Sequence, residues 1–161
     1  MRAASIHELK QELSVLKPNA LVEICLRLGK FKKENKELLT YLLYEAHNEA
    51  GFISGVKEEI SELFREINQS NIYWAKKSLR KIVRIINKYC RYSGVKESEL
   101  ELRIYFCELL IASGIPVSKS TVISNLYQSQ LKKIKELMAA MHEDIQHDYR
   151  RQLEKIVANK V

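Results

Sequence analysis

The scarcity of turn-forming residues is the feature that most constrains the fold of this chain. Its 161 residues include only five glycines and two prolines, while leucine, isoleucine, lysine and glutamate dominate. A β-sandwich or β-barrel needs many short strands joined by turns, and such turns depend on glycine and proline. The hydrophobic fraction of 46% is ordinary for a globular protein. The sequence therefore predicts an all-α protein, folded as an irregular bundle or a short helical array.

Capping residues and apolar periodicity predict six to seven helices. Ser5 with Glu8, and Ser98 with Glu101, have the spacing of a capping box, in which each side chain accepts the other residue's backbone N–H. Gly94 is typical of the position just after a helix C-terminus. The expected helices cover about 5–15, 18–28, 35–46, 56–68, 71–92, 98–113 and 120–157.

Three glycines in the first 55 residues are also predicted to mark helix boundaries. Gly29 is predicted to end the second helix, and Gly51 and Gly55 are predicted to bracket the turn before the fourth. Because no low-complexity linker divides the chain, residues 1–161 are predicted to form a single domain.

The last segment, about 120–157, reads as one long C-terminal helix with a bend or register change near His147. Uninterrupted, it would be about 55 Å long. Its apolar residues alternate four and three apart, like the seam of a coiled coil. Either the helix kinks back within a bundle, or the seam meets a second copy in a homodimer. The candidates for self-association are Met138, Met141 and Ile145.

Positive charge is concentrated in one predicted helix. Residues 70–92 contain seven lysines and arginines and no acidic residue, whereas the rest of the chain has 20 basic and 20 acidic residues. At about 100° per residue, six of these side chains fall within a stripe about 100° wide, opposite an apolar face. We call this stripe the basic ridge, and its members are Lys77, Arg80, Lys81, Arg84, Lys88 and Arg91.

The basic ridge leads to three interpretations. The first is a non-enzymatic protein–protein interaction module that recognises an acidic or amphipathic protein. The second is a nucleic-acid-binding protein that uses the same ridge, with Tyr73 and Trp74 as stacking surfaces. In the third, glutamates of the two neighbouring helices neutralise the ridge and leave a solvated face without a partner. Those glutamates are Glu58, Glu59, Glu62, Glu66, Glu97, Glu99, Glu101 and Glu108.

Catalytic and metal-binding signals are weak. Asp144 and His147 have the three-residue spacing of a carboxylate–histidine pair, but a di-iron bundle needs two such pairs and further carboxylates. No phosphate-binding, dinucleotide-binding or nucleophile-elbow motif occurs in the sequence. The chain is therefore predicted to be non-enzymatic and to hold no cofactor or metal. The alternative is an enzyme, metal-dependent or other.

The cysteines and the hydropathy pattern indicate the compartment. Cys25, Cys90 and Cys107 are an odd number without zinc-binding spacing, and they are expected to be reduced core thiols. There is no secretory signal and no apolar stretch long enough for a membrane span. We expect a cytoplasmic protein that has no contact with a membrane.

Short elements along the chain resemble a bacterial all-helical family of unknown function. They are Lys10-x-x-Leu13, Ala20-Leu21-Val22-Glu23-Ile24 with Leu28, Ala75-Lys76-Lys77, and Tyr127-x-Ser129 before the last helix. The resemblance implies a small cytosolic helical protein. Since the family has no assigned activity, it implies no functional residue.

Overall fold

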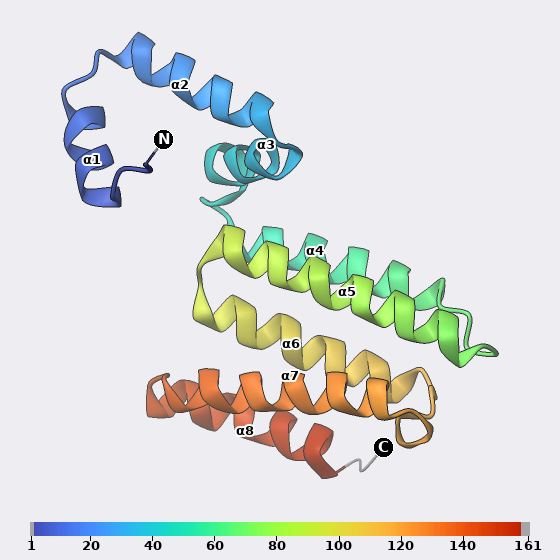
Figure 1. Cartoon of the computed structure of the whole chain (residues 1–161). Helices are drawn as coiled ribbons and strands as arrows, with labels where there is room; N and C mark the ends of the chain where they lie inside the picture. Colours follow the sequence, from blue (N-terminus) through green and yellow to red (C-terminus); the bar gives the residue numbers. More distant parts are fainter. Residues whose placement is uncertain (1, 159–161) are drawn as a thin grey trace. The chain divides into compact units, whose positions relative to one another are not determined.

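The computed structural model of the chain is shown in Figure 1 and describes residues 2–158. All regular structure in this range is helical, which confirms the predicted fold class. There are eight α-helices within it, where the sequence predicts six to seven, together with a π-helical turn at Tyr41–Glu45 and a 3-10 turn at Val117–Lys119. The α-helices are α1 (Ile6–Ser14), α2 (Pro18–Phe31), α3 (Lys33–Thr40), α4 (Glu49–Arg65), α5 (Ile72–Ser93), α6 (Lys96–Ala112), α7 (Thr121–Ala139) and α8 (Glu143–Ala158).

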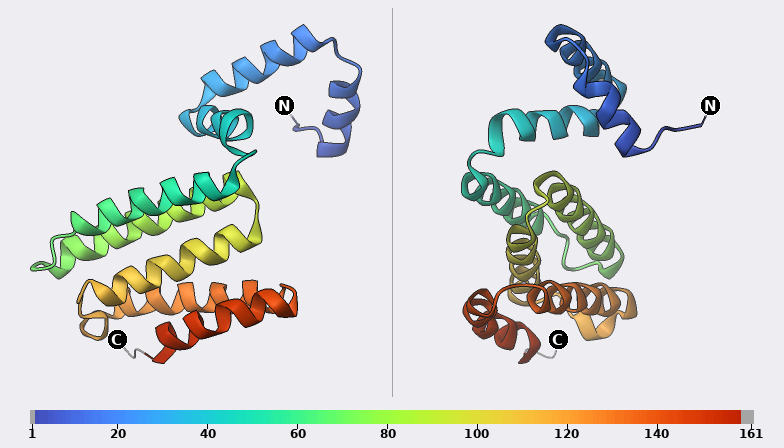
Figure 2. Two further views of the ribbon diagram at one scale, coloured as in Figure 1. Left: turned by 180° about the vertical axis from the view of Figure 1, so that it is seen from behind. Right: turned by 90° about the vertical axis from the view of Figure 1, so that its left-hand side faces the viewer.

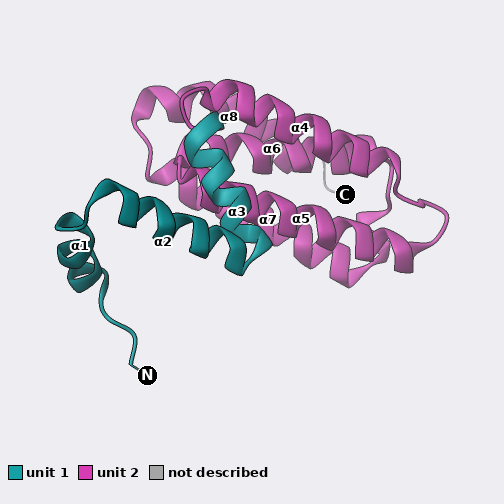
Figure 3. Ribbon diagram, turned by 90° about the horizontal axis from the view of Figure 1, so that it is seen from above, with its two compact units in different colours: residues 1–44 teal, residues 45–161 magenta. Residues whose placement is uncertain are grey.

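The chain divides into two compact units, where the sequence predicts a single domain. Unit 1 comprises Met1–Tyr44 and unit 2 comprises Glu45–Val161, as coloured in Figure 3. The division falls inside the π-helical turn.

Unit 1 contains α1, α2 and α3. The capping box at the start of α1 is confirmed: the Glu8 amide donates to Ser5 Oγ at 3.3 Å, and the Ser5 amide donates to Glu8 Oε2 at 2.7 Å. None of these three helices has a buried residue, although α2 packs against α3. The helices of this unit therefore contribute little to a hydrophobic core.

Gly29 does not end α2, contrary to the prediction. The helix continues through it to Phe31, and a Cβ built on Gly29 would lie 3.0 Å from Leu39 Cδ1. Gly29 is therefore where α3 approaches α2 closely, a second role that glycine commonly has. Asn35, inside α3, donates from Nδ2 to the carbonyl oxygen of Leu28 at 2.9 Å and so ties the two helices together.

Unit 2 is organised around α6. This helix contacts α4 and α5, and also α7 and α8, as Figures 1 and 2 show. Its buried residues are not confined to one stripe, a pattern expected of a helix enclosed by others. They are Ser98, Leu100, Leu102, Arg103, Ile104, Phe106, Cys107 and Leu110.

Three residues of unit 2 that are predicted to lie in a turn or at a helix cap lie inside helices instead. Gly51 and Gly55 both belong to α4, which begins after Asn48, whose side chain accepts the Gly51 amide at 3.1 Å. Ser98 lies within α6 and is buried, and its hydroxyl donates to Glu49 Oε1. The predicted turn and the predicted second capping box are therefore wrong.

The C-terminal segment forms two helices, so the prediction of a single helix with a bend near His147 is wrong. The chain leaves α7 after Ala139, re-enters helix at Glu143, and α8 packs back on α6 and α7. Tyr127 Oη donates to the carbonyl oxygen of Ile156 at 2.5 Å, which fastens the end of α8 to α7. Burying this segment against its own chain gives unit 2 a larger core.

A buried arginine links three helices of unit 2. Arg103 on α6 is 2% exposed, and its guanidinium donates to Glu99, to Gln130 Oε1 on α7 at 2.6 Å, and to Asn87 Oδ1 on α5 at 2.9 Å. The buried charge is thus paired and hydrogen-bonded, as such a group must be.

Candidate functional site

Helix α5 carries the whole basic ridge, because the residues that cap its two ends lie outside the ridge. The Asn71 side chain accepts the amides of Tyr73 and Trp74 at the N-terminus. At the C-terminus Gly94 has φ 68°, the left-handed conformation that favours glycine, as the sequence predicts. One face of the helix is buried in unit 2 through Ala75, Leu79, Ile82, Ile86 and Cys90.

The basic ridge lies on the opposite face of α5, which is exposed to solvent. Five of the six ridge residues are exposed and Lys88 is half-buried. The ammonium of Lys88 lies 4.7 Å from the centre of the Tyr89 ring. Within residues 2–158, the other five ridge side chains form no ion pair with a carboxylate at 4.0 Å or less. These five are Lys77, Arg80, Lys81, Arg84 and Arg91.

Several of the glutamates considered as neutralising partners are bonded elsewhere. Glu99 pairs with Arg103, and Glu101 Oε1 lies 2.6 Å from Lys57 Nζ. Glu59 Oε2 accepts a hydrogen bond from Tyr89 Oη at 2.7 Å. Direct pairing with these carboxylates therefore does not cover the ridge.

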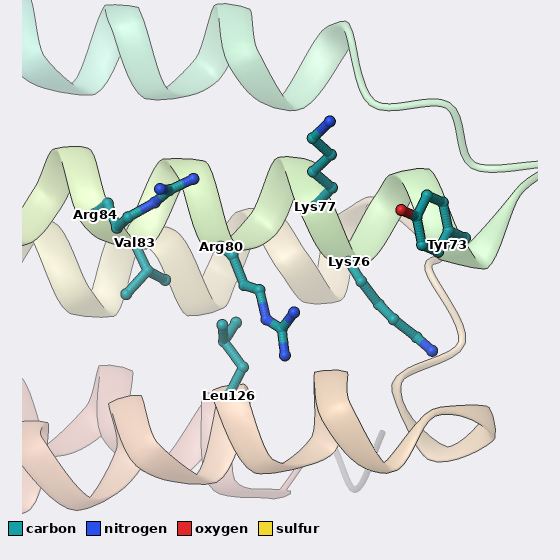
Figure 4. Close-up of a pocket in the computed structure, with 7 residues that line it drawn as sticks. All are labelled: Tyr73, Lys76, Lys77, Arg80, Val83, Arg84 and Leu126. Atoms are coloured by element: carbon teal, nitrogen blue, oxygen red, sulfur yellow. The ribbon is translucent and has the colours of Figure 1, made fainter.

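A groove runs between α5 and α7 along one edge of the ridge. Figure 4 shows Val83 of α5 and Leu126 of α7 pointing toward each other, with Arg80 extending between the two helices and Lys76 pointing toward α7 beside it. Both apolar side chains are partly buried against the core. We call this cavity, of about 590 Å³, the α5–α7 groove; it is lined by Tyr73, Lys76, Lys77, Arg80, Val83, Arg84 and Leu126.

The groove includes residues that the sequence analysis did not assign to the site. Lys76 lies just outside the predicted stripe, on the flank of α5 that also carries Val83. The helical period of the sequence already places Lys76 beside the basic ridge, so the sequence contains a signal for it. Leu126 has no such signal, because its place in the groove depends on how α7 packs against α5.

Two aromatic side chains are exposed at the N-terminal end of the ridge. Tyr73 is 65% exposed and Trp74 is 49% exposed, and their rings meet edge to face with centroids 5.3 Å apart. Lys77 Nζ lies 5.2 Å from the centre of the Trp74 ring, within the range of a cation–π contact. The aromatic pair therefore extends the ridge with a surface that could stack on a planar group.

The residues predicted for self-association are placed differently. Met138 is buried in the core of unit 2, Met141 packs against that core, and Ile145 is half-buried. Much of the apolar seam is thus used within the chain, because α8 folds back beside it. Met138 is not a surface residue.

The histidine-rich segment remains open to solvent. His142 Nδ1 lies 3.2 Å from Asp144 Oδ2, and His147 Nδ1 lies 4.0 Å from Asp148 Oδ1, with all four side chains exposed. Asp144 and His147 do not converge with other ligands: across the described part of the chain, no three His, Cys, Asp or Glu side chains are grouped to hold a metal ion.

The cysteines differ in exposure. Cys90 and Cys107 are buried, as predicted, whereas Cys25 is exposed, so the prediction that it is a core thiol is wrong. Burial raises the pKa of each of the two buried thiols to about 12, so both are protonated at neutral pH.

The chain has no match among known protein families, curated proteins or solved structures. Among residues 2–158, no helix is both long and apolar enough to cross a bilayer.

Proposed function

We propose that this protein is a non-enzymatic interaction module whose basic ridge on α5 binds an acidic protein partner. The observation that carries the proposal is the set of five exposed ridge cations that lack a carboxylate partner among the described residues. Helix α5 includes seven basic residues and no acidic one, so the local positive field is not cancelled along its own length. Such a field steers an oppositely charged partner toward the surface.

Electrostatics alone supports only modest affinity. An exposed ion pair contributes about 0.2–1 kcal/mol, and salt screens it. Several pairs acting along one helix, together with apolar contacts at their edge, are needed for a stable complex. The ridge and the α5–α7 groove share Lys77, Arg80 and Arg84, so charged and apolar contacts are available at the same edge of α5.

The burial of two cysteines and the exposure of the histidines support the proposal that the protein is not an enzyme. The buried Cys90 and Cys107 thiols are poor nucleophiles because their pKa is about 12. His142 and His147 are exposed, each beside a single carboxylate.

Charge reversal tests the proposal. A variant with Lys81→Glu, Arg84→Glu and Arg91→Glu should keep the wild-type melting curve, since all three side chains are exposed, and should lose the partner in a quantitative pull-down. A matched control reverses three exposed basic residues of α7 and α8, namely Lys132→Glu, Lys135→Glu and Arg151→Glu. The control has the same net charge as the test variant and should retain the partner. A test variant that retains it as well as wild type refutes the proposal.

Nucleic acid is the second candidate, favoured by the exposed Tyr73–Trp74 pair at the end of the ridge. A protein that neutralises several phosphates loses affinity steeply as salt rises. Titration of single-stranded and duplex oligonucleotides at low and physiological salt measures this dependence. An absence of binding at low salt eliminates this candidate.

A further inference from the structure

We infer that the α5–α7 groove receives an acidic amphipathic helix of the partner, with an apolar side chain between Val83 and Leu126 and carboxylates along α5. The inference rests on the proposed function and specifies the form of the partner. Three features of the groove carry it: the spacing of its cations, their confinement to one wall, and the two apolar side chains that face each other across it.

The spacing of the cations matches a helix. Lys76, Arg80 and Arg84 follow one another at intervals of four residues along α5, which places them about 6 Å apart along its axis. Carboxylates four residues apart on a second helix have the same interval. Two of the three cations are arginines, whose planar guanidinium binds a carboxylate through two parallel hydrogen bonds.

The cations line only one wall of the groove. All four basic lining residues come from α5, while α7 contributes Leu126 and has no charged residue between Thr121 and Leu131. A helix in the groove therefore meets positive charge on one side and a neutral surface on the other. This asymmetry requires an occupant with an acidic face and an adjacent uncharged face.

Two side chains that line the groove are aliphatic, Val83 of α5 and Leu126 of α7. Val83 and Leu126 are each only partly buried, so the groove leaves some of their surface in water. Covering apolar surface stabilises a complex in proportion to the area covered, a gain that an apolar anchor side chain provides and a purely charged chain does not. The facing pair of Val83 and Leu126 therefore favours an amphipathic protein helix over a polyanion that offers only charge.

A pair of synthetic peptides tests this inference on the full-length protein. The first is a helix-stabilised peptide of about 14 residues with glutamates at four-residue intervals and leucines on the neighbouring face. The second replaces the leucines by glutamine and keeps the charge. We expect the first to bind at least about tenfold more tightly in fluorescence anisotropy at fixed salt.

Variants of the groove locate the contact. Leu126→Gln should remove most of the leucine-dependent gain and leave binding of the glutamine peptide unchanged. Because a change at a partly buried leucine could affect folding, Val83→Thr, which keeps the side-chain shape, provides a second test. Both variants are compared at equal folded fraction by circular dichroism.

Three other outcomes are informative. Equal affinity for the two peptides, lost on charge reversal of the ridge, overturns the groove inference and leaves the proposed function standing. Failure of both peptides to bind overturns the inference, and the charge-reversal pull-down then decides the proposed function separately. If a single-stranded oligonucleotide binds more tightly than either peptide and displaces them, the occupant is a nucleic acid and the inference is wrong.

Discussion

Arg103 shows how a single charged residue can specify the packing of helices. Its guanidinium links α6 to Asn87 of α5 and Gln130 of α7, and Glu99 compensates its charge. Replacing it by a neutral residue leaves these polar groups without a partner in a largely buried site, which costs more than losing a surface pair.

We therefore predict that Arg103→Met lowers the free energy of unfolding by roughly 2–4 kcal/mol in urea denaturation. The control is Lys132→Met, which removes the 3.8 Å pair of Lys132 with Glu136 on the surface of α7. That change should cost less than about 0.5 kcal/mol. Similar losses in the two variants would mean that the Arg103 network does not hold the helices together.

The buried thiols predict how stability depends on pH. In the folded state burial raises the pKa of Cys90 and Cys107 from 9.0 to about 12, so the folded protein retains protons that the unfolded chain loses above pH 9. Stability is therefore fully present below about pH 9 and declines as pH rises toward 12.

The expected decline is up to about 1.4 kcal/mol per thiol for each pH unit in this window. The unfolding free energy, measured at about pH 8 and about pH 10, should fall more in wild type than in a variant with Cys90→Ala and Cys107→Ala. Parallel pH profiles for the two proteins would contradict the assignment of both thiols to the core.

At the scale of the helical elements, two glycines with different roles provide a matched test. Gly94 has φ 68° after α5, whereas Gly55 lies inside α4 with open space around the position of a Cβ. Gly94→Ala should cost about 1 kcal/mol because of its backbone conformation. Gly55→Ala should stabilise the protein by about 0.5–1 kcal/mol because alanine favours the helix. Thermal melts of the two variants should therefore shift in opposite directions, and a loss of stability in Gly55→Ala would contradict a continuous α4.

Helix boundaries that depend on local backbone chemistry could be predicted from the sequence, whereas those that depend on distant partners could not. The box at Ser5 and Glu8 and the cap at Gly94 act through local backbone chemistry, which sequence spacing reveals. Gly29 and Ser98 have roles that depend on distant partners, Leu39 and Glu49. The turn between α7 and α8 contains no glycine or proline, so its place is determined by how α8 packs rather than by a local signal.

One part of the candidate site could also be predicted from the sequence, and another part could not. The basic ridge follows from the helical period alone, because all its residues belong to α5. The α5–α7 groove requires Leu126 from another helix and could not be read from periodicity. The burial of Met138 agrees with one of the two alternatives that the sequence leaves open, because a seam with coiled-coil spacing does not indicate whether it packs within its own chain or on another.

At the scale of the whole molecule, the two units differ in how much core they contain. Every residue of the buried hydrophobic cluster lies between Ile53 and Ile156, within unit 2. A protein that lacks residues 1–44 should therefore unfold cooperatively, with a melting temperature within a few degrees of the full chain. Removing residues 143–161 instead deletes the buried Ile156 and its bond from Tyr127, and should abolish cooperative unfolding. Loss of cooperativity in the first truncation would contradict an independent core in unit 2.

The measurement that tests the central claim most directly is competitive acylation of lysines in the native protein, read by mass spectrometry. Lys81 belongs to the ridge and is exposed, Lys132 is an exposed reference on α7, and Lys57 is a partly buried reference paired with Glu101 at 2.6 Å. An open ridge predicts that Lys81 reacts about as fast as Lys132 and several-fold faster than Lys57. If Lys81 reacts as slowly as Lys57, carboxylates or another surface cover the ridge, and the proposed binding face does not exist.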